Sequence, residues 1–156
     1  DERLRIGHFV IPQNAIPDEG TSYHYPLPGK KIKASPRIFK RIQSLCELKA
    51  QTWVCGKVWT TDAPFRETPP KIKKAKHQKA IAVEMELSAF LKVGAFYGVE
   101  VGALLVVSDE LFARQWNPGY NTQAYKKAFV KSIDIALQIL SQPEEQDERR
   151  QQARLK

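Results

Sequence analysis

The stretch Ile81-Ala82-Val83-Glu84-Met85-Glu86-Leu87-Ser88-Ala89-Phe90 decides the fold. It begins as a short apolar run typical of a buried strand and continues as the start of a helix. If Ile81–Glu86 is extended, the two-residue period of a strand places Glu84 and Glu86 on the same side. Two like charges at one strand tip are costly to bury unless each has a partner. The pair is therefore either solvated at a strand end or part of a polar site.

A second acidic strand end favours the polar site. The apolar run Val101–Val107 breaks abruptly at Ser108-Asp109-Glu110. A run without alternation is typical of a strand covered on both faces, as in a parallel sheet. Ligands of open α/β sheets bind beyond the carboxyl ends of the strands. We therefore expect Glu84, Glu86 and Asp109 to share one pocket, the alternative for Asp109 being an N-cap of the following segment.

Composition narrows the class of protein. The chain has 156 residues and 42% hydrophobic content, which suits one domain with a sizeable core. A net charge of +8 and a pI near 9.5 raise the question of nucleic acid. The lysine clusters at 30–33 and 71–79 lack interleaved aromatic residues, so solvated faces are favoured over nucleic-acid binding.

Cysteine usage and targeting signals bear on location. Cys46 and Cys55 have no metal-ligand spacing, so no metal site is expected, and they fit small buried residues of a reducing compartment. The sequence shows no signal peptide and no apolar run of membrane length. We expect a cytoplasmic protein that does not contact membranes.

Strands and helices alternate along most of the chain, which predicts an α/β fold with a mixed or mostly parallel central sheet flanked by helices. Residues 13–29 are rich in turn formers and are expected to form a long loop. The expected strands cover 3–12, 52–60, 81–86 and 101–107, and the expected helices cover 36–49, 69–78, 87–97 and 122–140. Residues 142–156 read as a charged tail, either a helical extension or disordered.

Apolar spacing predicts which helix faces are buried. In the helix over 87–97 the expected buried residues are Phe90, Leu91, Val93 and Ala95, with Gly98 as the C-cap. The last helix carries an apolar stripe formed by Ala128, Phe129, Ile133, Ala136, Leu137 and Leu140.

Four blocks in order resemble the C-terminal half of the nucleoside phosphorylase family. The blocks are Ile16–Ser22, Gly56–Thr68, Val83–Glu86 and Val106–Asp109. That family includes bacterial purine nucleoside and uridine phosphorylases, and the methylthioadenosine and S-adenosylhomocysteine nucleosidases. The resemblance implies a phosphorylase/hydrolase-like fold in which residues 1–141 form the C-terminal part of the domain, apparently without the N-terminal half.

The resemblance also implies roles at the sugar. Glu86 matches the glutamate that binds both ribose hydroxyls, a task suited to the two acceptor oxygens of a carboxylate. Met85 matches the residue that packs against the ribose, although a lone methionine is also an ordinary core filler. Glu84 either assists the sugar contact or braces the site.

At the base, Asp109 matches the general acid that protonates the purine ring, with Ser108 positioning it. Phe65 is a candidate for base stacking, or alternatively a core residue, and Arg66 or Glu67 could reach the base edge. Purine phosphorylases often have an arginine in the helix after the acid, where this chain has Tyr125-Lys126-Lys127. The activation of the acid is therefore left open.

The expected reaction is phosphorolysis of a purine nucleoside to the free base and ribose 1-phosphate, with phosphate as co-substrate and no cofactor. The family's phosphate-binding motifs lie in its first half and have no match here, so this chain alone should be inactive. The expected partners are the nucleoside, phosphate and further copies of the chain, as a dimer or a hexamer of dimers. The alternatives are a nucleosidase that uses water, and a non-catalytic nucleoside-binding relative.

Overall fold

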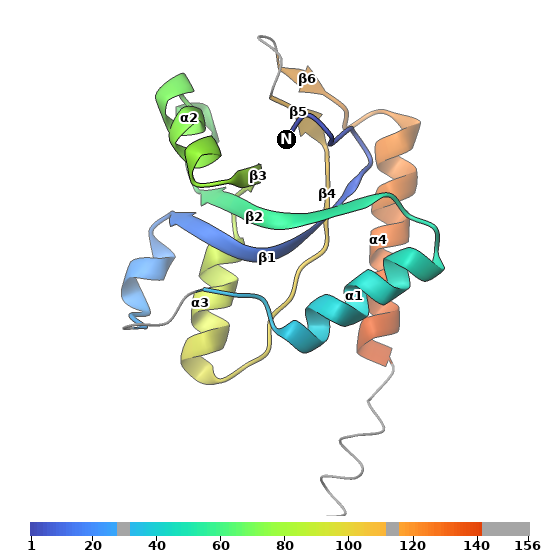
Figure 1. Cartoon of the computed structure of the whole chain (residues 1–156), viewed down its shortest axis with the longest axis horizontal. Helices are drawn as coiled ribbons and strands as arrows, with labels where there is room; N and C mark the ends of the chain where they lie inside the picture. The colour runs from blue at the N-terminus through green and yellow to red at the C-terminus, as the bar shows by residue number, and fades with distance from the viewer. Residues whose placement is uncertain (28–31, 112–115, 142–156) are drawn as a thin grey trace, which may run out of the picture.

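The computed structural model describes residues 1–27, 32–111 and 116–141. Its centre is a four-stranded sheet in the order β3-β2-β1-β4 (Figure 1). The strands β1 (Phe9–Asp18), β2 (Trp53–Thr61) and β3 (Ala80–Glu84) are parallel, and β4 (Leu105–Val106) is antiparallel to β1. The expected α/β fold with a mixed, mostly parallel sheet is confirmed.

Helices cover both faces of this sheet (Figure 1). On one face α1 (Pro36–Leu48) and α4 (Gln123–Ser141) lie against each other, and on the other lies α3 (Leu87–Tyr97). The helix α2 (Pro69–His77) contacts β3. The smaller elements are the 3-10 turns η1 (Thr21–His24) and η2 (Pro64–Arg66) and a two-stranded ribbon of β5 (Asp109–Glu110) and β6 (Asn117–Pro118).

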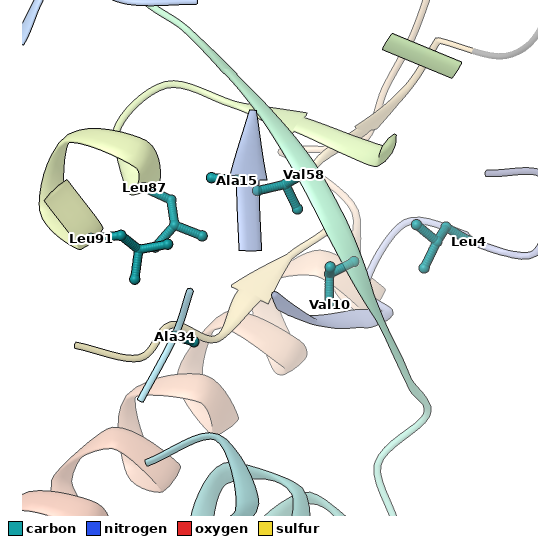
Figure 2. Packing of buried hydrophobic residues seen from close by; sticks show 7 residues of the cluster. All are labelled: Leu4, Val10, Ala15, Ala34, Val58, Leu87 and Leu91. Carbon is teal, nitrogen blue, oxygen red and sulfur yellow. The ribbon is translucent and has the colours of Figure 1, made fainter. Parts of the chain in front are cut away.

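The alternation of β1 divides the core into two clusters. Phe9 and Ile11 point toward α1 and α4, where they meet Ile42 and Ile135. The other cluster faces α3 and includes Val10, Ala15, Val58, Leu87 and Leu91, together with Leu4 and Ala34 (Figure 2). Because successive side chains of a strand point to opposite faces, one apolar segment supplies both cores.

The helix ends follow the expected capping chemistry. The Ser35 hydroxyl accepts a hydrogen bond from the Ile38 N–H at 3.4 Å, and Pro36 occupies the first turn of α1. Gly98 ends α3 with a left-handed φ of 71°, which glycine adopts without the cost a side chain would bring. Both predicted helix boundaries are confirmed.

The prediction of a loop over residues 13–29 is wrong for residues 13–18. Those residues continue β1 as far as Asp18, with a register shift between Pro12 and Asn14, in parallel pairing with β2. The prolines are tolerated because β4 pairs only with Phe9 and Val10. Beyond them the second side of β1 has a single bridge, between Asn14 and Lys33.

The strand expected over residues 101–107 is also largely wrong. Only Leu105 and Val106 pair in the sheet. The residues before them pass the start of α1, where Ser35 N donates to Val101 O at 2.7 Å. A Cβ on Gly102 would lie 2.4 Å from the Ile38 side chain. The apolar run is thus shared between a sheet edge and a helix surface, which the pattern alone does not distinguish.

Two predicted buried faces need correction. In α3, Leu91 is buried and Val93 half-buried, whereas Phe90 and Ala95 are exposed. In α4, Ala128 is buried, but the rest of the expected stripe is exposed: Phe129, Ile133, Ala136, Leu137 and Leu140. The helix packs instead through Ala128, Ile135 and Ile139. Two apolar faces therefore compete on α4, and the one that includes Ile135 meets the sheet.

The two cysteines differ in burial. Cys46 is buried, and burial raises the pKa of its thiol to about 11, while Cys55 is half-buried. Of the helices in the described part of the chain, none combines the length and apolarity needed to span a bilayer. The predicted charged tail and part of the lysine cluster at 30–33 lie outside the described residues.

The packing of α4 gives a direct test. We expect Ile135→Ala to lower the free energy of unfolding by about 2–5 kcal/mol, because a fully buried isoleucine leaves a cavity. Ile133→Ala is the matched control on the exposed face and should cost roughly 0.5 kcal/mol or less. Urea denaturation of the two variants measures this, and equal losses would contradict the observed orientation of the helix.

Candidate functional site

A cavity of about 1070 Å³ runs along β3 and β4. Its walls come from residues 80–86, residues 104–111, the N-terminal segment, the loop after β2, α2, and one face of α4 with Tyr125, Phe129 and Ser132. Glu84, Met85 and Glu86 line it where β3 ends, and Ser108 and Asp109 line it after β4. All five lie in the two acidic strand ends that the sequence singled out.

The two acidic strand ends do not meet at one edge of the sheet. Glu84 lies opposite Thr60, near the carboxyl ends of the parallel strands. Val106 lies opposite Phe9, at the beginning of β1, because β4 runs antiparallel. The predicted common pocket thus exists, but the predicted reason for it was wrong: the cavity extends along the sheet and reaches both ends.

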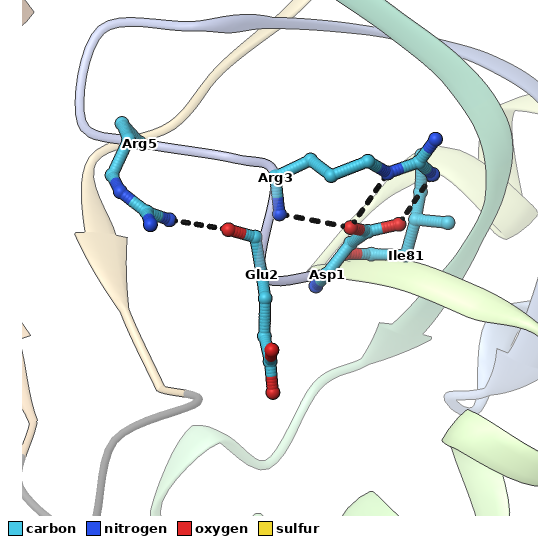
Figure 3. A network of polar contacts seen from close by, with 5 residues as sticks. All are labelled: Asp1, Glu2, Arg3, Arg5 and Ile81. Carbon is cyan, nitrogen blue, oxygen red and sulfur yellow. Dashed lines mark hydrogen bonds and ion pairs between the residues drawn. The ribbon is translucent and has the colours of Figure 1, made fainter.

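The N-terminal segment forms another part of the wall. Figure 3 shows its polar contacts. The Asp1 amino group donates to Ile81 O on β3 at 2.8 Å. The Arg3 guanidinium binds the Asp1 carboxylate at 2.6 Å, and Arg5 donates to Glu2 O at 2.6 Å. The bond to Ile81 attaches the segment to β3, and the other two bonds lie within the segment. Asp1 and Leu4 line the cavity.

Glu84 is held by β2 and by the start of α3. The Thr60 hydroxyl donates to its Oε1, and the N–H groups of Glu86 and Leu87 donate to Oε2 at 2.8 and 2.6 Å. Burial raises the pKa of Glu84 in spite of these bonds. An anion that satisfies the first N–H groups of a helix acts as its cap, so the contacts favour a bracing role over direct sugar binding.

The same network contains a buried acid for which the sequence suggested no role. The Ser88 N–H donates to Thr60 Oγ1 at 3.0 Å, and the Ser88 hydroxyl donates to Glu19 Oε1 at 2.6 Å. Glu19 is only 6% exposed and also accepts from Ser22 N at 3.0 Å. The one sequence feature that pointed to Glu19 is its position in the Ile16–Ser22 block, which is one of the four blocks that resemble the nucleoside phosphorylase family. Glu19 therefore joins the end of β1 to α3.

Met85 and Glu86 face the cavity. Met85 is 42% exposed, so it does not fill the core. Glu86 is exposed, and within the described ranges its carboxylate takes part in no hydrogen bond or ion pair, although its backbone N–H is bound by Glu84. Its two oxygens are therefore available to a ligand.

Asp109 is held by two donors. The Ser108 hydroxyl donates to Oδ1 at 2.6 Å, and the Trp116 indole N–H donates to Oδ2 at 2.7 Å. Asp109 lies in β5, paired with Pro118, and α4 begins only at Gln123. The alternative role of Asp109 as a helix N-cap is therefore wrong, and the Thr122 hydroxyl instead accepts from Tyr125 N at 3.2 Å.

The loop after β2 contributes differently from expectation. Phe65 is fully exposed and lines the cavity. The alternative prediction, that Phe65 is a core residue, is therefore wrong. Arg66 is exposed and does not line the cavity. Its neighbour Glu67 is half-buried and does line it. Burial, and secondly the charge of Asp109, raise the pKa of Glu67.

A row of aromatic rings lines the cavity beside Asp109. The centroids are 6.3 Å apart for Trp116 and Tyr120, 6.2 Å for Tyr120 and Tyr125, and 5.9 Å for Tyr125 and Phe129. All four residues line the cavity. Tyr125 and Phe129 are four residues apart on a helix, which was the available signal for part of this row. Flat rings of this kind suit a planar ligand.

Cations are scarce in the cavity even though the chain is basic. Lys126 and Lys127, the expected positions for a cation assisting Asp109, are exposed and do not line it. Lys76 is the one lysine or arginine among the described lining residues, beside six acids: Asp1, Glu67, Glu84, Glu86, Asp109 and Glu110. In the ranges that the structure describes, no three His, Cys, Asp or Glu side chains are grouped to hold a metal ion.

Two solved structures share the α/β fold of this chain. The chain is similar to a solved AMP nucleosidase from Bacteroides thetaiotaomicron, with a TM-score of 0.69 and 24% identity over 88% of this chain and 57% of that one. It is also similar to the purine nucleoside phosphorylase of Toxoplasma gondii in complex with immucillin-H, with a TM-score of 0.75 and 16% identity over 87% and 56%. These similarities show the fold.

The chain belongs to the Phosphorylase superfamily, whose model matches residues 1–141. Among curated proteins it is 34% identical over 87 residues to a DeoD-type purine nucleoside phosphorylase of Bacillus cytotoxicus. It is 35% identical over 82 residues to one of Bacillus cereus. The matched regions cover 56% and 53% of this chain but only 36% and 34% of those relatives. The resemblance to this family is thus confirmed.

The contacts of Glu84 allow a test of whether this residue stabilises the fold or serves only to bind a ligand. We expect Glu84→Ala to lower the free energy of unfolding by about 1–3 kcal/mol, because Thr60 and two helix N–H groups lose their acceptor. Glu86→Ala, two residues further along the chain at the cavity lining, should change it by roughly 0.5 kcal/mol or less. Urea denaturation compares the two, and a stable Glu84→Ala variant would contradict the bracing role.

Proposed function

We propose that the cavity binds a purine nucleoside and that the chain forms the nucleoside-binding part of a purine nucleoside phosphorylase-like enzyme. The observation that carries this proposal is the pairing of two different carboxyl groups in one cavity. Glu86 has uncommitted oxygens beside Met85, and Asp109 is fixed by two donors beside a row of aromatic rings. A sugar with neighbouring hydroxyls and a planar base need these two environments.

At the sugar, Glu86 accepts hydrogen bonds from both ribose hydroxyls. A carboxylate offers two oxygens with a spacing that suits neighbouring hydroxyl groups. Met85 supplies an apolar surface for the face of the ring. Glu84 acts indirectly, because its bonds to Thr60 and to the start of α3 fix the direction in which Glu86 leaves the strand.

At the base, Asp109 acts as the general acid. When the bond between the sugar and the base breaks, its electron pair moves into the purine ring, and the Asp109 proton passes to a ring nitrogen. Ser108 and Trp116 fix the carboxyl group in place. Phe65, at the exposed edge of the cavity, and the aromatic row are the surfaces that would stack on the base. Arg66 lies outside the cavity lining, which weakens its case for the base edge.

The second substrate is phosphate, whose oxygen forms the new bond to the sugar carbon. Six acids and one lysine line the cavity within the described part of the chain, which is a poor environment for an anion. Phosphate binding would therefore depend on residues outside this chain, which spans about a third of its curated relatives. The 156-residue chain alone is then expected to be inactive.

The same scarcity of cations supports a second candidate function, hydrolysis by a nucleosidase. Water needs no cationic site, and the AMP nucleosidase that shares the fold shows that the architecture accommodates such enzymes. In a non-catalytic relative the cavity would bind a nucleoside without cleaving it.

We place the protein in the cytoplasm, as an assembly of several copies, in line with the sequence-based expectation.

Release of the free base tests the proposal. This chain, and the longest open reading frame that contains it, would be incubated with inosine, adenosine, guanosine and methylthioadenosine, with and without phosphate. We expect phosphate-dependent release by the longer form and a loss of about 10²–10⁴-fold in Asp109→Asn, because proton transfer to the base fails. Glu110→Gln, a carboxyl on the adjacent residue, is the matched control and should retain activity.

Each other outcome has a definite meaning. Release that is independent of phosphate would establish the nucleosidase. Binding of nucleoside without any release would establish the non-catalytic relative. Full activity of Asp109→Asn would remove Asp109 from the reaction.

A further inference from the structure

We propose that a further β-strand binds in the cavity and pairs with the open edge of β4. This strand is an extended, mostly apolar segment of a longer protein, from outside the 156 residues of this chain. The proposal concerns the completion of the sheet, and it does not depend on whether the protein cleaves nucleosides.

β3 and β4 are the outer strands of the sheet. In the described part of the chain the strand order is β3-β2-β1-β4, so each of these two strands has a strand neighbour on one side only. The backbone of an outer strand presents a row of N–H and C=O groups that no neighbouring strand pairs. An extended segment can add to such an edge as one more strand.

The cavity lies along the edge of β4 and not over one face of the sheet. The side chains of Leu105 and Val107 pack with the core cluster that faces α3, whereas Leu104 and Val106 pack with the cluster that faces α1 and α4. All four residues nevertheless line the cavity. Residues that point to opposite faces of a sheet share only the edge of their strand. The cavity therefore borders the backbone of β4.

The edge of β3 borders the same cavity. All five residues of Ala80–Glu84 line it, and all are half-buried, without the alternation of a strand that has one covered face. The Ile81 C=O accepts a hydrogen bond from the Asp1 amino group at 2.8 Å. This edge thus already binds one donor from outside the sheet, and the two open edges share one cavity.

The hydrogen bonds of Val107 show which backbone groups of β4 are directed into the cavity. Its N–H donates to His8 O at 3.0 Å, and its C=O accepts from Gly7 N at 2.9 Å, so both groups bind the chain at the start of β1. In an extended antiparallel strand, successive residues direct their N–H and C=O groups to opposite sides. The N–H and C=O of Val106 are therefore directed to the open side of β4.

The lining defines the chemistry of the added strand. Along both edges it consists of alanine, valine, leucine and isoleucine, in residues 80–83 and 104–107. Residues 101–107 are half-buried throughout, although a continuous apolar run is typical of a strand that is covered on both faces. Acids follow both edges, at Glu84 and Asp109. An apolar segment without acidic residues fits these surroundings, because it leaves no unpaired charge in the cavity.

The relatives indicate where such a strand comes from. The matched regions cover only 36% and 34% of the two DeoD-type phosphorylases, and this chain covers 57% and 56% of the two solved structures that share its fold. Each of these proteins has sufficient further chain to supply a strand. A second copy of this chain is the other possible source of an edge partner, and hydrogen exchange separates the two.

Amide hydrogen exchange tests the proposal, with the longest open reading frame that contains this chain as the longer form. In this chain alone we expect the Val106 N–H to exchange at least about a hundredfold faster than the Val107 N–H, which is bonded to His8 O. In the longer form Val106 should be protected, and the two rates should agree within roughly tenfold. Val107 is the matched control, because its bond exists in both forms.

The added strand is identified by a nuclear Overhauser effect between the Val106 amide and a residue outside this chain. Fast exchange of Val106 in both forms would overturn the proposal, and so would a reading frame that adds no further segment. Protection of Val106 in this chain alone, together with sedimentation as a dimer, would assign the edge to a second copy and would also overturn it. Nucleoside cleavage enters none of these readouts, so they are separate from the test of the proposed function.

Discussion

The structure depends on one carboxylate, that of Glu84. Its oxygens receive the Thr60 hydroxyl from β2 and two N–H groups at the start of α3, so a single side chain joins two strands and a helix. Ser88 and Glu19 extend this polar connection to the end of β1. Because these buried polar groups satisfy one another, the strand-to-helix turn has a defined geometry. That turn presents Met85 and Glu86 to the cavity.

The charge distribution separates the surface from the cavity. The chain carries a net charge of +8, yet acids outnumber lysines on the described cavity wall by six to one. The net charge of the chain therefore gives no guide to the ligand, and the basic helix α2 contributes one lysine, Lys76, to the cavity lining. An acidic cavity suits a neutral ligand with hydroxyl groups and a proton-accepting ring better than an anion.

The sequence predicted the local features that depend on neighbouring residues. The start of α1 at Pro36 and the end of α3 at Gly98 both follow from short-range chemistry. It failed where the partner is distant. The direction of β4 depends on which edge of the sheet is open, and the buried side of α4 depends on α1. For the same reason Glu67, Trp116 and Tyr120 received no definite role before the fold placed them in the cavity that Asp109 also lines.

The most direct test of the account is nucleoside binding observed at Met85, the only methionine of the chain. Labelled with carbon-13 at its methyl group, the protein gives one signal, from the cavity wall. The account predicts a saturable shift of that signal with inosine at roughly 1 mM or below, loss of the effect in Glu86→Gln, and no shift with phosphate alone. An unchanged signal with every purine nucleoside would contradict it.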